Sequence, residues 1–274
     1  MTVYNTQNQW GGSSAPWNDG GVLSIGNRAD QQPIALSIRS DDGGQTFTVT
    51  MTYQGEGPIG FRGTLTTTHT YQVENQWGGD AAPWNDAGLF LLGARADQKP
   101  IAFELASNDG GQTLRGTMTY DGEGPIGVQG TLSEGVAFVA ANQWGGSSAP
   151  WNPGGLWVIG CRANQPVVAL DVTSDDQGNT LNGWMTYFGE GPIGFRGKRT
   201  MADTYAVENQ WGGDSAPWNL GGTWVLGCRP DQGVVAINVN NAGGNGLSGT
   251  MTYTGEGPIG LELVPGTVKA LSHA

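Results

Sequence analysis

The stretch Thr46-Phe47-Thr48-Val49-Thr50-Met51-Thr52-Tyr53 alternates threonine with a large apolar residue. Because successive side chains of a strand point to opposite faces, this stretch predicts a strand with one buried face. A shorter alternation in Ile34–Ile38 precedes it, and Asp41-Asp42-Gly43-Gly44 between the two is typical of a hairpin turn. Three further runs bring the expected strands in this part of the chain to about five: Val3–Gln9, Val22–Asn27 and Ile59–Leu65.

The same pattern occurs four times in the 274 residues. Asn-Gln-Trp-Gly-Gly recurs at intervals of 67 residues, starting at Asn8, Asn75, Asn142 and Asn209. Gly-Glu-Gly-Pro-Ile-Gly starts at Gly55, Gly122, Gly189 and Gly255, so the fourth unit is one residue shorter. Such self-similarity means tandem copies of one structural unit.

We expect an all-β fold, because no apolar pattern with a period of 3.6 residues is long enough for a helix. A single unit of 67 residues would leave exposed sheet edges, whereas two units supply about ten strands, enough to close a barrel. The sequence therefore predicts two tandem, compact, antiparallel ten-stranded β-barrels, each built from two 67-residue repeats. Their expected boundaries are residues 1–133 and 134–274.

The composition excludes several classes of protein. Glycine makes up 48 of 274 residues, but 11 tryptophans argue against disorder. A net charge of −12 makes nucleic acid an improbable partner. No apolar run approaches 18 residues, so membrane insertion is not expected. Met1–Thr6 has no signal-peptide character, which predicts a cytoplasmic protein and leaves non-classical release open.

Four features of the unit combine the chemistry that an uncharged polyol needs. Trp77-Gly78-Gly79 places an indole, with its flat apolar face and polar N–H edge, before two residues that lack a Cβ and can present backbone N–H groups. Gly55-Glu56-Gly57 offers a carboxylate, and Arg28 a guanidinium. A pyranose has an apolar face and hydroxyls that donate and accept, so the pattern predicts a carbohydrate site.

The competing interpretation is that these residues serve only the fold, with tryptophan in the core and glycine in turns. Binding is slightly favoured for the tryptophan before the two glycines, and Arg and Glu could simply pair with each other, a contact of little worth for stability when exposed. Yet four of only 12 basic residues occupy the same position in every unit. A place in the core is favoured for the second tryptophan of each unit: Trp17, Trp84, Trp151 and Trp218.

A glycoside hydrolase is the enzymatic alternative, and it needs two carboxylates around one bond. The second repeated candidate is Asp30, Asp97 and Asp231, but the third unit has Asn164 there. A glutamate beside an arginine also favours the ionised form over a general acid. We therefore expect no catalytic residues.

No metal or cofactor is expected either. His69 and His273 lie outside the repeated motifs, and acidic turns such as Ser40–Gly43 lose their charge in the fourth unit, where Asn240-Asn241-Ala242 stands. The two cysteines, Cys161 and Cys228, occupy a slot filled by Asn27 and Ala94 in the other units, which marks a small-residue position rather than a redox pair.

Together the motifs Asn-Gln-Trp-Gly-Gly-[Ser/Asp]-x-Ala-Pro-Trp-Asn, Gly-x-Arg and Gly-Glu-Gly-Pro-Ile-Gly closely resemble the Oscillatoria agardhii agglutinin homologue (OAAH) family of antiviral lectins, in its four-unit type. The resemblance covers essentially the whole chain. It implies a ten-stranded barrel for each pair of units and non-catalytic binding of high-mannose oligosaccharides at the branched α3,α6-mannose core. It also implies glycoprotein partners, viral envelope glycoproteins among them, and we expect a monomer. A protein-interaction repeat remains the alternative.

The resemblance further implies four binding sites, each joining the Trp-Gly-Gly loop of one unit to the Arg and the Gly-Glu-Gly loop of its partner unit. The residues carried over are Trp10, Gly11 and Gly12 with Arg95, Glu123 and Gly124; Trp77, Gly78 and Gly79 with Arg28, Glu56 and Gly57; Trp144, Gly145 and Gly146 with Arg229, Glu256 and Gly257; and Trp211, Gly212 and Gly213 with Arg162, Glu190 and Gly191.

Overall fold

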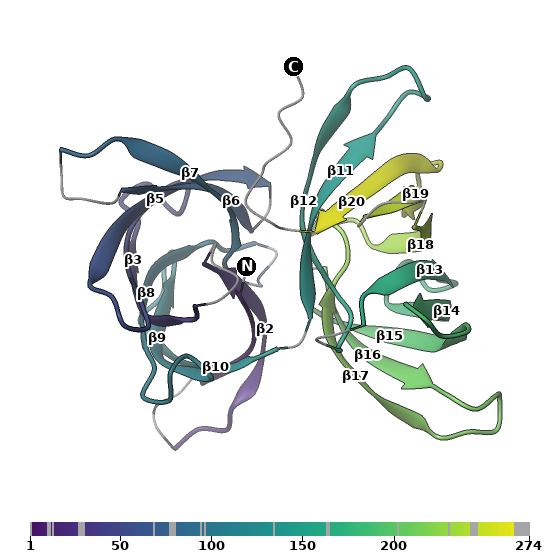
Figure 1. Ribbon diagram of the computed structural model, residues 1–274, viewed down its shortest axis with the longest axis horizontal. Helices are drawn as coiled ribbons and strands as arrows, with labels where there is room; N and C mark the ends of the chain where they lie inside the picture. Colours follow the sequence, from purple (N-terminus) through teal and green to yellow (C-terminus); the bar gives the residue numbers. More distant parts are fainter. Residues whose placement is uncertain are drawn as a thin grey trace. The chain divides into compact units, whose positions relative to one another are not determined.

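The computed structural model forms two compact units of strands, one within residues 1–133 and one within residues 134–265 (Figure 1). In the ranges it describes, no helix is both long and apolar enough to cross a membrane. The described residues are 2–9, 12, 14–26, 31–67, 69–76, 81–93, 95, 97–133, 135–162, 165–201, 203–229, 231–241 and 246–265.

Each unit contains ten strands, five from each repeat, as the sequence predicts. The first unit holds β1 (Thr2–Gln9), β2 (Asn18–Ile25), β3 (Pro33–Arg39), β4 (Thr46–Tyr53), β5 (Pro58–Thr67), β6 (Thr70–Gln76), β7 (Trp84–Leu91), β8 (Pro100–Ala106), β9 (Thr113–Tyr120) and β10 (Ile126–Leu132). The second holds β11 (Val136–Gln143), β12 (Trp151–Ile159), β13 (Val167–Thr173), β14 (Thr180–Tyr187), β15 (Ile193–Met201), β16 (Thr204–Gln210), β17 (Trp218–Val225), β18 (Val234–Asn240), β19 (Leu247–Tyr253) and β20 (Ile259–Pro265).

The alternation that predicts the strands is confirmed by burial. In β4 the apolar side chains are buried and Thr46, Thr48 and Thr50 are exposed. The turn between β3 and β4 is a hairpin turn as expected, since Asp42 accepts hydrogen bonds from the backbone N–H and the hydroxyl of Thr46. Most strand boundaries differ from the expected ones by one or two residues, and the largest difference is at the start of the second strand. The strand expected at Val22–Asn27 starts at Asn18, because a bulge at Gly20 interrupts the alternation without ending the pairing with β1.

Both units are closed antiparallel barrels, which confirms the predicted fold class. The strand order of the first is β1-β10-β9-β8-β3-β4-β5-β6-β7-β2. The hairpin β1–β2 of one repeat therefore lies between β10 and β7 of the other repeat, and β6–β7 lies between β5 and β2. The second barrel repeats this exchange with β11–β12 and β16–β17. No repeat pairs all its strand edges within itself.

The end of the fourth repeat closes the second barrel. The sequence Leu263-Val264-Pro265 departs from the other repeats, yet it forms the end of β20 and pairs with β11, with Phe138 opposite Pro265. Proline can occupy this position because the strand ends there. Residues 266–274 lie outside the described part of the chain.

Each barrel has one core of inward-pointing side chains. The tyrosine of each Met-Thr-Tyr motif is fully buried. The second barrel also buries Trp157 and Trp224, whose indole N–H groups donate to the backbone oxygens of Gly154 and Gly221 at 3.2 and 2.8 Å. Each indole N–H thus keeps a partner inside the core.

Two equivalent positions, His69 before β6 and Asp203 before β16, carry buried titratable groups of opposite kind. Burial lowers the pKa of His69 to about 4, and neither ring nitrogen has a hydrogen-bond partner among the described residues. Burial also raises the pKa of Asp203 to about 7, with nearby Asp231 raising it further and Arg199 opposing. His69 is therefore neutral in the folded protein near pH 6, and Asp203 keeps its proton.

We predict opposite pH dependences for the two barrels. Between pH 6.5 and 4 the unfolded His69 binds a proton that the folded one does not, so the first barrel loses stability as the pH falls. Between pH 4 and 7 the folded Asp203 keeps a proton that the unfolded one releases, so the second barrel loses stability as the pH rises. Each contribution is on the order of 3 kcal/mol.

Hydrogen exchange of core amides in each barrel, corrected for intrinsic rates, measures this dependence. His69→Asn should flatten the profile of the first barrel alone, and Asp203→Asn that of the second. Profiles that the two variants leave unchanged would contradict the assignment.

Candidate functional site

The Trp-Gly-Gly loops connect the strands of the exchanged hairpins, and the glycines described in them adopt left-handed conformations: Gly12, Gly145, Gly146, Gly212 and Gly213. Gly145 and Gly146, between β11 and β12, have φ of 94° and 92°. The backbone N–H of Ala149 donates to the oxygen of Gly146 at 3.0 Å, and the Gln143 side-chain amide donates to the oxygen of Ala149 at 2.6 Å. Only glycine adopts these angles without strain, so the motif fixes a tight turn held from β11.

The tryptophans of these loops are partly core and partly surface. Trp144 and Trp211 are half-buried and pack against the core of the second barrel. Their indole N–H groups are buried and lack a hydrogen-bond partner among the described residues. The polar edge of each indole is therefore turned inward. Contact with a ligand falls to the exposed part of the ring.

An arginine joins each of these loops to the partner repeat. The guanidinium carbon of Arg229 lies 4.5 Å from the centre of the buried Tyr253 ring and 5.1 Å from that of Trp144. Arg229 Nη1 donates to Gln232 Oε1 and to Glu256 Oε1, each at 2.6 Å. Stacking and hydrogen bonds together hold a charged side chain that is only a quarter exposed.

The same cluster recurs in the other described positions. Arg162 lies 4.3 Å from the Tyr187 ring and 4.9 Å from the Trp211 ring, and it donates to Glu190 at 2.7 Å. In the first barrel, Arg95 lies 4.2 Å from the ring of Tyr120 and donates to Glu123 at 2.6 Å and to Gln98. Because the same arrangement occurs around three arginines, it is a regular feature of the repeat and not a chance ion pair on the surface.

The exchanged hairpins explain why residues from different repeats meet. Since β11 pairs with β20, the loop after β11 lies beside the Gly-Glu-Gly loop that precedes β20. Since β12 neighbours β17, the segment after β17 brings Arg229 to the same end of the barrel. The grouping expected for Trp144, Arg229 and Glu256 is present in the structure, and so is that for Trp211, Arg162 and Glu190.

The first barrel is described only in part. Gly12, Arg95, Glu123 and Gly124 are described, as are Glu56 and Gly57. The predicted site residues outside the described residues are Trp10, Gly11, Trp77, Gly78, Gly79 and Arg28.

The second glycine of Gly-Glu-Gly has open space beside its Cα in every repeat. A Cβ at Gly57, Gly124, Gly191 or Gly257 would meet no atom within 4 Å, and none of the four has a left-handed φ. Alanine would therefore fit the folded chain at these positions. This space is open in all four repeats, and in the three whose arginine is described it lies beside an ion pair of that arginine with the glutamate, so a ligand could approach the backbone there.

The second tryptophans contradict their expected place in the core. Trp17 is 39% exposed, and Trp84, Trp151 and Trp218 are half-buried outside both cores. They lie on the outer barrel face above the last glycine of Gly-Glu-Gly-Pro-Ile-Gly, where a Cβ at Gly260 would stand 3.3 Å from Trp151. Arg62 and Arg196 stack on Trp84 and Trp218. The prediction failed because it weighed the size of the side chain and not the bare glycine beneath it.

Two partners of the arginine, a glutamine and a tyrosine, were not predicted from the sequence. A glutamine follows every arginine by three residues, and Gln165 and Gln232 bridge Arg to Glu, accepting from the arginine and donating to the glutamate at 3.2 Å. The arginine also stacks on the tyrosine of the Met-Thr-Tyr sequence that occurs in every repeat. The regular recurrence of both residues was the available signal.

The family can now be assigned. The model of the OAA-family lectin sugar binding domain matches the chain four times, at residues 2–66, 69–133, 136–200 and 203–265. These matches cover nearly all of both barrels. The chain belongs to the OAA lectin family.

Relatives of OAA-family type extend over the whole chain. Myxobacterial hemagglutinin of Myxococcus xanthus is 59% identical over 262 residues, which cover 95% of this chain and 98% of the relative. The crystal structure of that hemagglutinin in complex with α3,α6-mannopentaose has a TM-score of 0.92 at 58% identity and covers 96% of this chain and 100% of its own. The Burkholderia oklahomensis agglutinin has a TM-score of 0.92 at 56% identity, covering 96% of this chain and 94% of its own.

In two of the OAA-family clusters, electrostatics lower the pKa of the glutamate and so favour its charged form. Hydrogen bonds from Arg95 lower the pKa of Glu123, and hydrogen bonds from Arg162 and Gln165 lower that of Glu190. This direction agrees with the expectation from sequence and gives a permanent acceptor beside a permanent donor. Within the described residues, no three His, Cys, Asp or Glu side chains gather to hold a metal ion.

The two kinds of loop glycine should respond differently to alanine. Gly146→Ala forces a side chain into a left-handed conformation and should lower the free energy of unfolding of the second barrel by about 1–2 kcal/mol. Gly257→Ala meets open space at an ordinary φ and should change it by less than about 0.5 kcal/mol. Urea unfolding of the two variants makes the comparison. Equal losses would show that both loops constrain the chain alike.

Proposed function

We propose that the chain is a non-catalytic lectin that binds high-mannose N-glycans at the branched α3,α6-mannose core through four sites. The observation that carries the proposal is the Trp–Arg–Glu cluster beside a glycine with open space above its backbone. Support comes from the close likeness to the Myxococcus xanthus hemagglutinin, whose crystal structure contains α3,α6-mannopentaose.

The chemistry of the cluster suits a neutral sugar. The apolar face of a pyranose stacks on the exposed part of Trp144, and its hydroxyls accept from the backbone N–H groups of the glycine loops. Glu256 accepts from hydroxyls, and Arg229 has N–H donors besides the Nη1 that Gln232 and Glu256 share. Because Arg229 is already stacked and hydrogen-bonded, little side-chain order remains to be imposed on binding.

The same cluster is unsuited to glycoside hydrolysis. A general acid needs a raised pKa, whereas hydrogen bonds from arginine lower the pKa of Glu123 and Glu190. The third repeat has Asn164 at the position of the other candidate carboxylate. Turnover of an aryl mannoside would overturn this part of the proposal.

Four sites on one chain would make it an agglutinin. Linked sites raise avidity by about 10²–10⁴ where the geometry lets two of them bind together. We propose glycoproteins rich in mannose as the partners, viral envelope glycoproteins among them, and a monomeric protein. A protein-interaction repeat is the second candidate, and a glycan array separates the two, because a blank array would favour a protein partner.

The proposal predicts about four moles of mannopentaose bound per mole of protein in isothermal titration calorimetry, one for each matched repeat. Gly257→Ala should reduce the stoichiometry toward three without affecting folding, because its Cβ enters the space assigned to the sugar. Absence of heat at millimolar sugar would refute the proposal.

The exchange of hairpins predicts which site each arginine serves. Arg229→Ala should weaken mannopentaose binding at the Trp144 site by about tenfold or more, since it removes charge-assisted hydrogen bonds and frees Glu256. The Trp211 site should be spared. Amide shifts of Gly146 and Gly213 in an NMR titration report on the two sites separately.

Arg95→Ala should act likewise in the first barrel, weakening the Trp10 site and sparing the Trp77 site. A loss confined to the loop of the arginine's own repeat would contradict the pairing across repeats.

A further inference from the structure

The third repeat differs from the others by two exposed aromatic side chains next to its Gly-Glu-Gly loop. Trp184 is 53% exposed and Phe188 is 67% exposed. Trp184, Thr186 and Phe188 are two residues apart, so all three lie on the outer face of β14 and its continuation. The other repeats have polar residues at both positions: Thr50, Thr117 and Thr250 in place of Trp184, and Gln54, Asp121 and Thr254 in place of Phe188.

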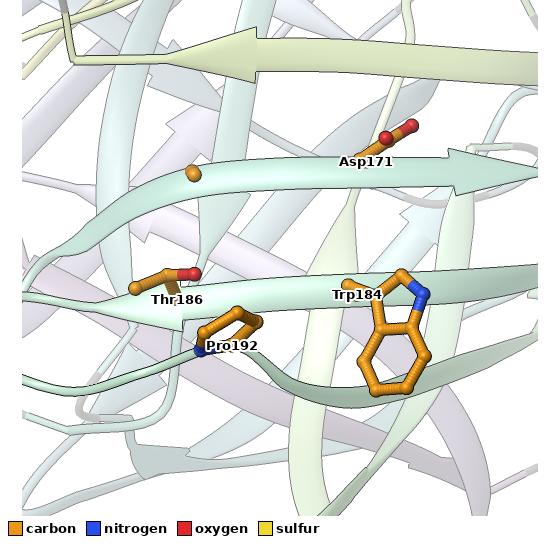
Figure 2. Close-up of a pocket in the computed structure, with 5 residues that line it drawn as sticks. Asp171, Trp184, Thr186 and Pro192 are labelled. Carbon is orange, nitrogen blue, oxygen red and sulfur yellow. The ribbon is translucent and has the colours of Figure 1, made fainter.

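A hollow of about 470 Å³ lies beside Trp184. Its lining comes from neighbouring strands: Asp171 on β13 stands directly opposite Trp184 on β14, and Pro192 just precedes β15. Figure 2 shows these side chains together with Thr186, with the indole of Trp184 extending toward β15. Ala169 completes the lining. The hollow therefore has one large aromatic face, a carboxylate and a hydroxyl.

This hollow adjoins the cluster of Trp211, Arg162 and Glu190. Gly189-Glu190-Gly191 stands between Phe188 and Pro192, and Glu190 accepts a hydrogen bond from Arg162 at 2.7 Å. Gly191, with no atom within 4 Å of a built Cβ, leaves the passage across the loop open. A ligand bound at the cluster can thus extend over the loop to Trp184.

The barrel itself does not require this tryptophan. Three of four repeats fold the same strand with threonine at the position, and more than half of the Trp184 side chain remains in solvent. An exposed indole beside a carboxylate acceptor and a hydroxyl matches a pyranose, which stacks one face and offers hydroxyl donors. The lining contains no basic side chain, so an anionic ligand is disfavoured.

We propose that Trp184, with Asp171, Thr186 and Pro192, forms an additional subsite for a mannose-type pyranose in an arm of the glycan whose core occupies the Trp211 site. This inference rests on the proposed lectin function and extends it, because it makes one of the four sites selective for longer glycans. The equivalent site of the same barrel, around Trp144, has Thr250 and Asn238 instead and serves as an internal control.

The test compares α3,α6-mannopentaose with a high-mannose oligosaccharide of nine mannose residues, by NMR titration of the full chain. Shifts of the Gly213 and Gly146 amides give the affinity of each site, and the indole N–H of Trp184 reports on the hollow. The larger glycan should shift the Trp184 signal and bind the Trp211 site about three- to tenfold more tightly than the Trp144 site.

Trp184→Thr, which restores the residue of the other repeats, should remove this difference and leave mannopentaose affinity unchanged. The reverse exchange, Thr250→Trp with Asn238→Asp, should raise the affinity of the Trp144 site for the larger glycan.

An unmoved Trp184 signal, with equal affinity in Trp184→Thr, would overturn the subsite while leaving the lectin function intact. Failure of mannopentaose to bind at all would overturn both. Sedimentation equilibrium provides the remaining check: if Trp184→Thr abolishes self-association and leaves glycan affinity unchanged, the aromatic pair is a contact between copies and the subsite proposal is wrong.

Discussion

The pairing of strand edges between repeats is the constraint on which the rest of the structure depends. A repeat of five strands has unpaired edges, and it resolves this by placing its first hairpin between strands of its partner repeat. In the second barrel, each Trp-Gly-Gly loop is thereby placed beside a Gly-Glu-Gly loop of the other repeat. The candidate sites are a consequence of barrel closure, since the residues of one repeat alone cannot assemble them.

Within this frame the arginine organises the site. The guanidinium stacks on the ring of a buried tyrosine. Its Nη1 donates one hydrogen bond to the glutamine and another to the glutamate. The tryptophan ring is also close enough to the guanidinium for a cation–π contact. Because the supporting tyrosine is part of the core, the position of the arginine is tied to the packing of the barrel. This coupling explains how an exposed loop cluster is held in one geometry.

The sequence predicted those parts of the molecule that follow from local pattern. Alternating residues such as Phe47, Val49 and Met51 predicted the strands. The number of strands in two repeats predicted a closed barrel. The exchange of hairpins has no local signal, since neither the alternation nor the turn residues say which edge a strand joins. It was available only through resemblance to a family. The prediction that Trp17 lies in the core was wrong for a related reason. Its position depends on a glycine of another repeat, Gly127, which lies beneath its ring.

Divergence among the repeats separates what the barrel needs from what it permits. The glycines of the Trp-Gly-Gly and Gly-Glu-Gly motifs, such as Gly146 and Gly257, are the same in all four units. Positions on the outer face or at buried turns differ, as with Trp184 against threonine and His69 against Asp203. The four repeats share the residues of the cluster, whereas the residues on the surface around them differ from one repeat to the next. Four sites built alike therefore need not bind alike, because each cluster has neighbours of its own.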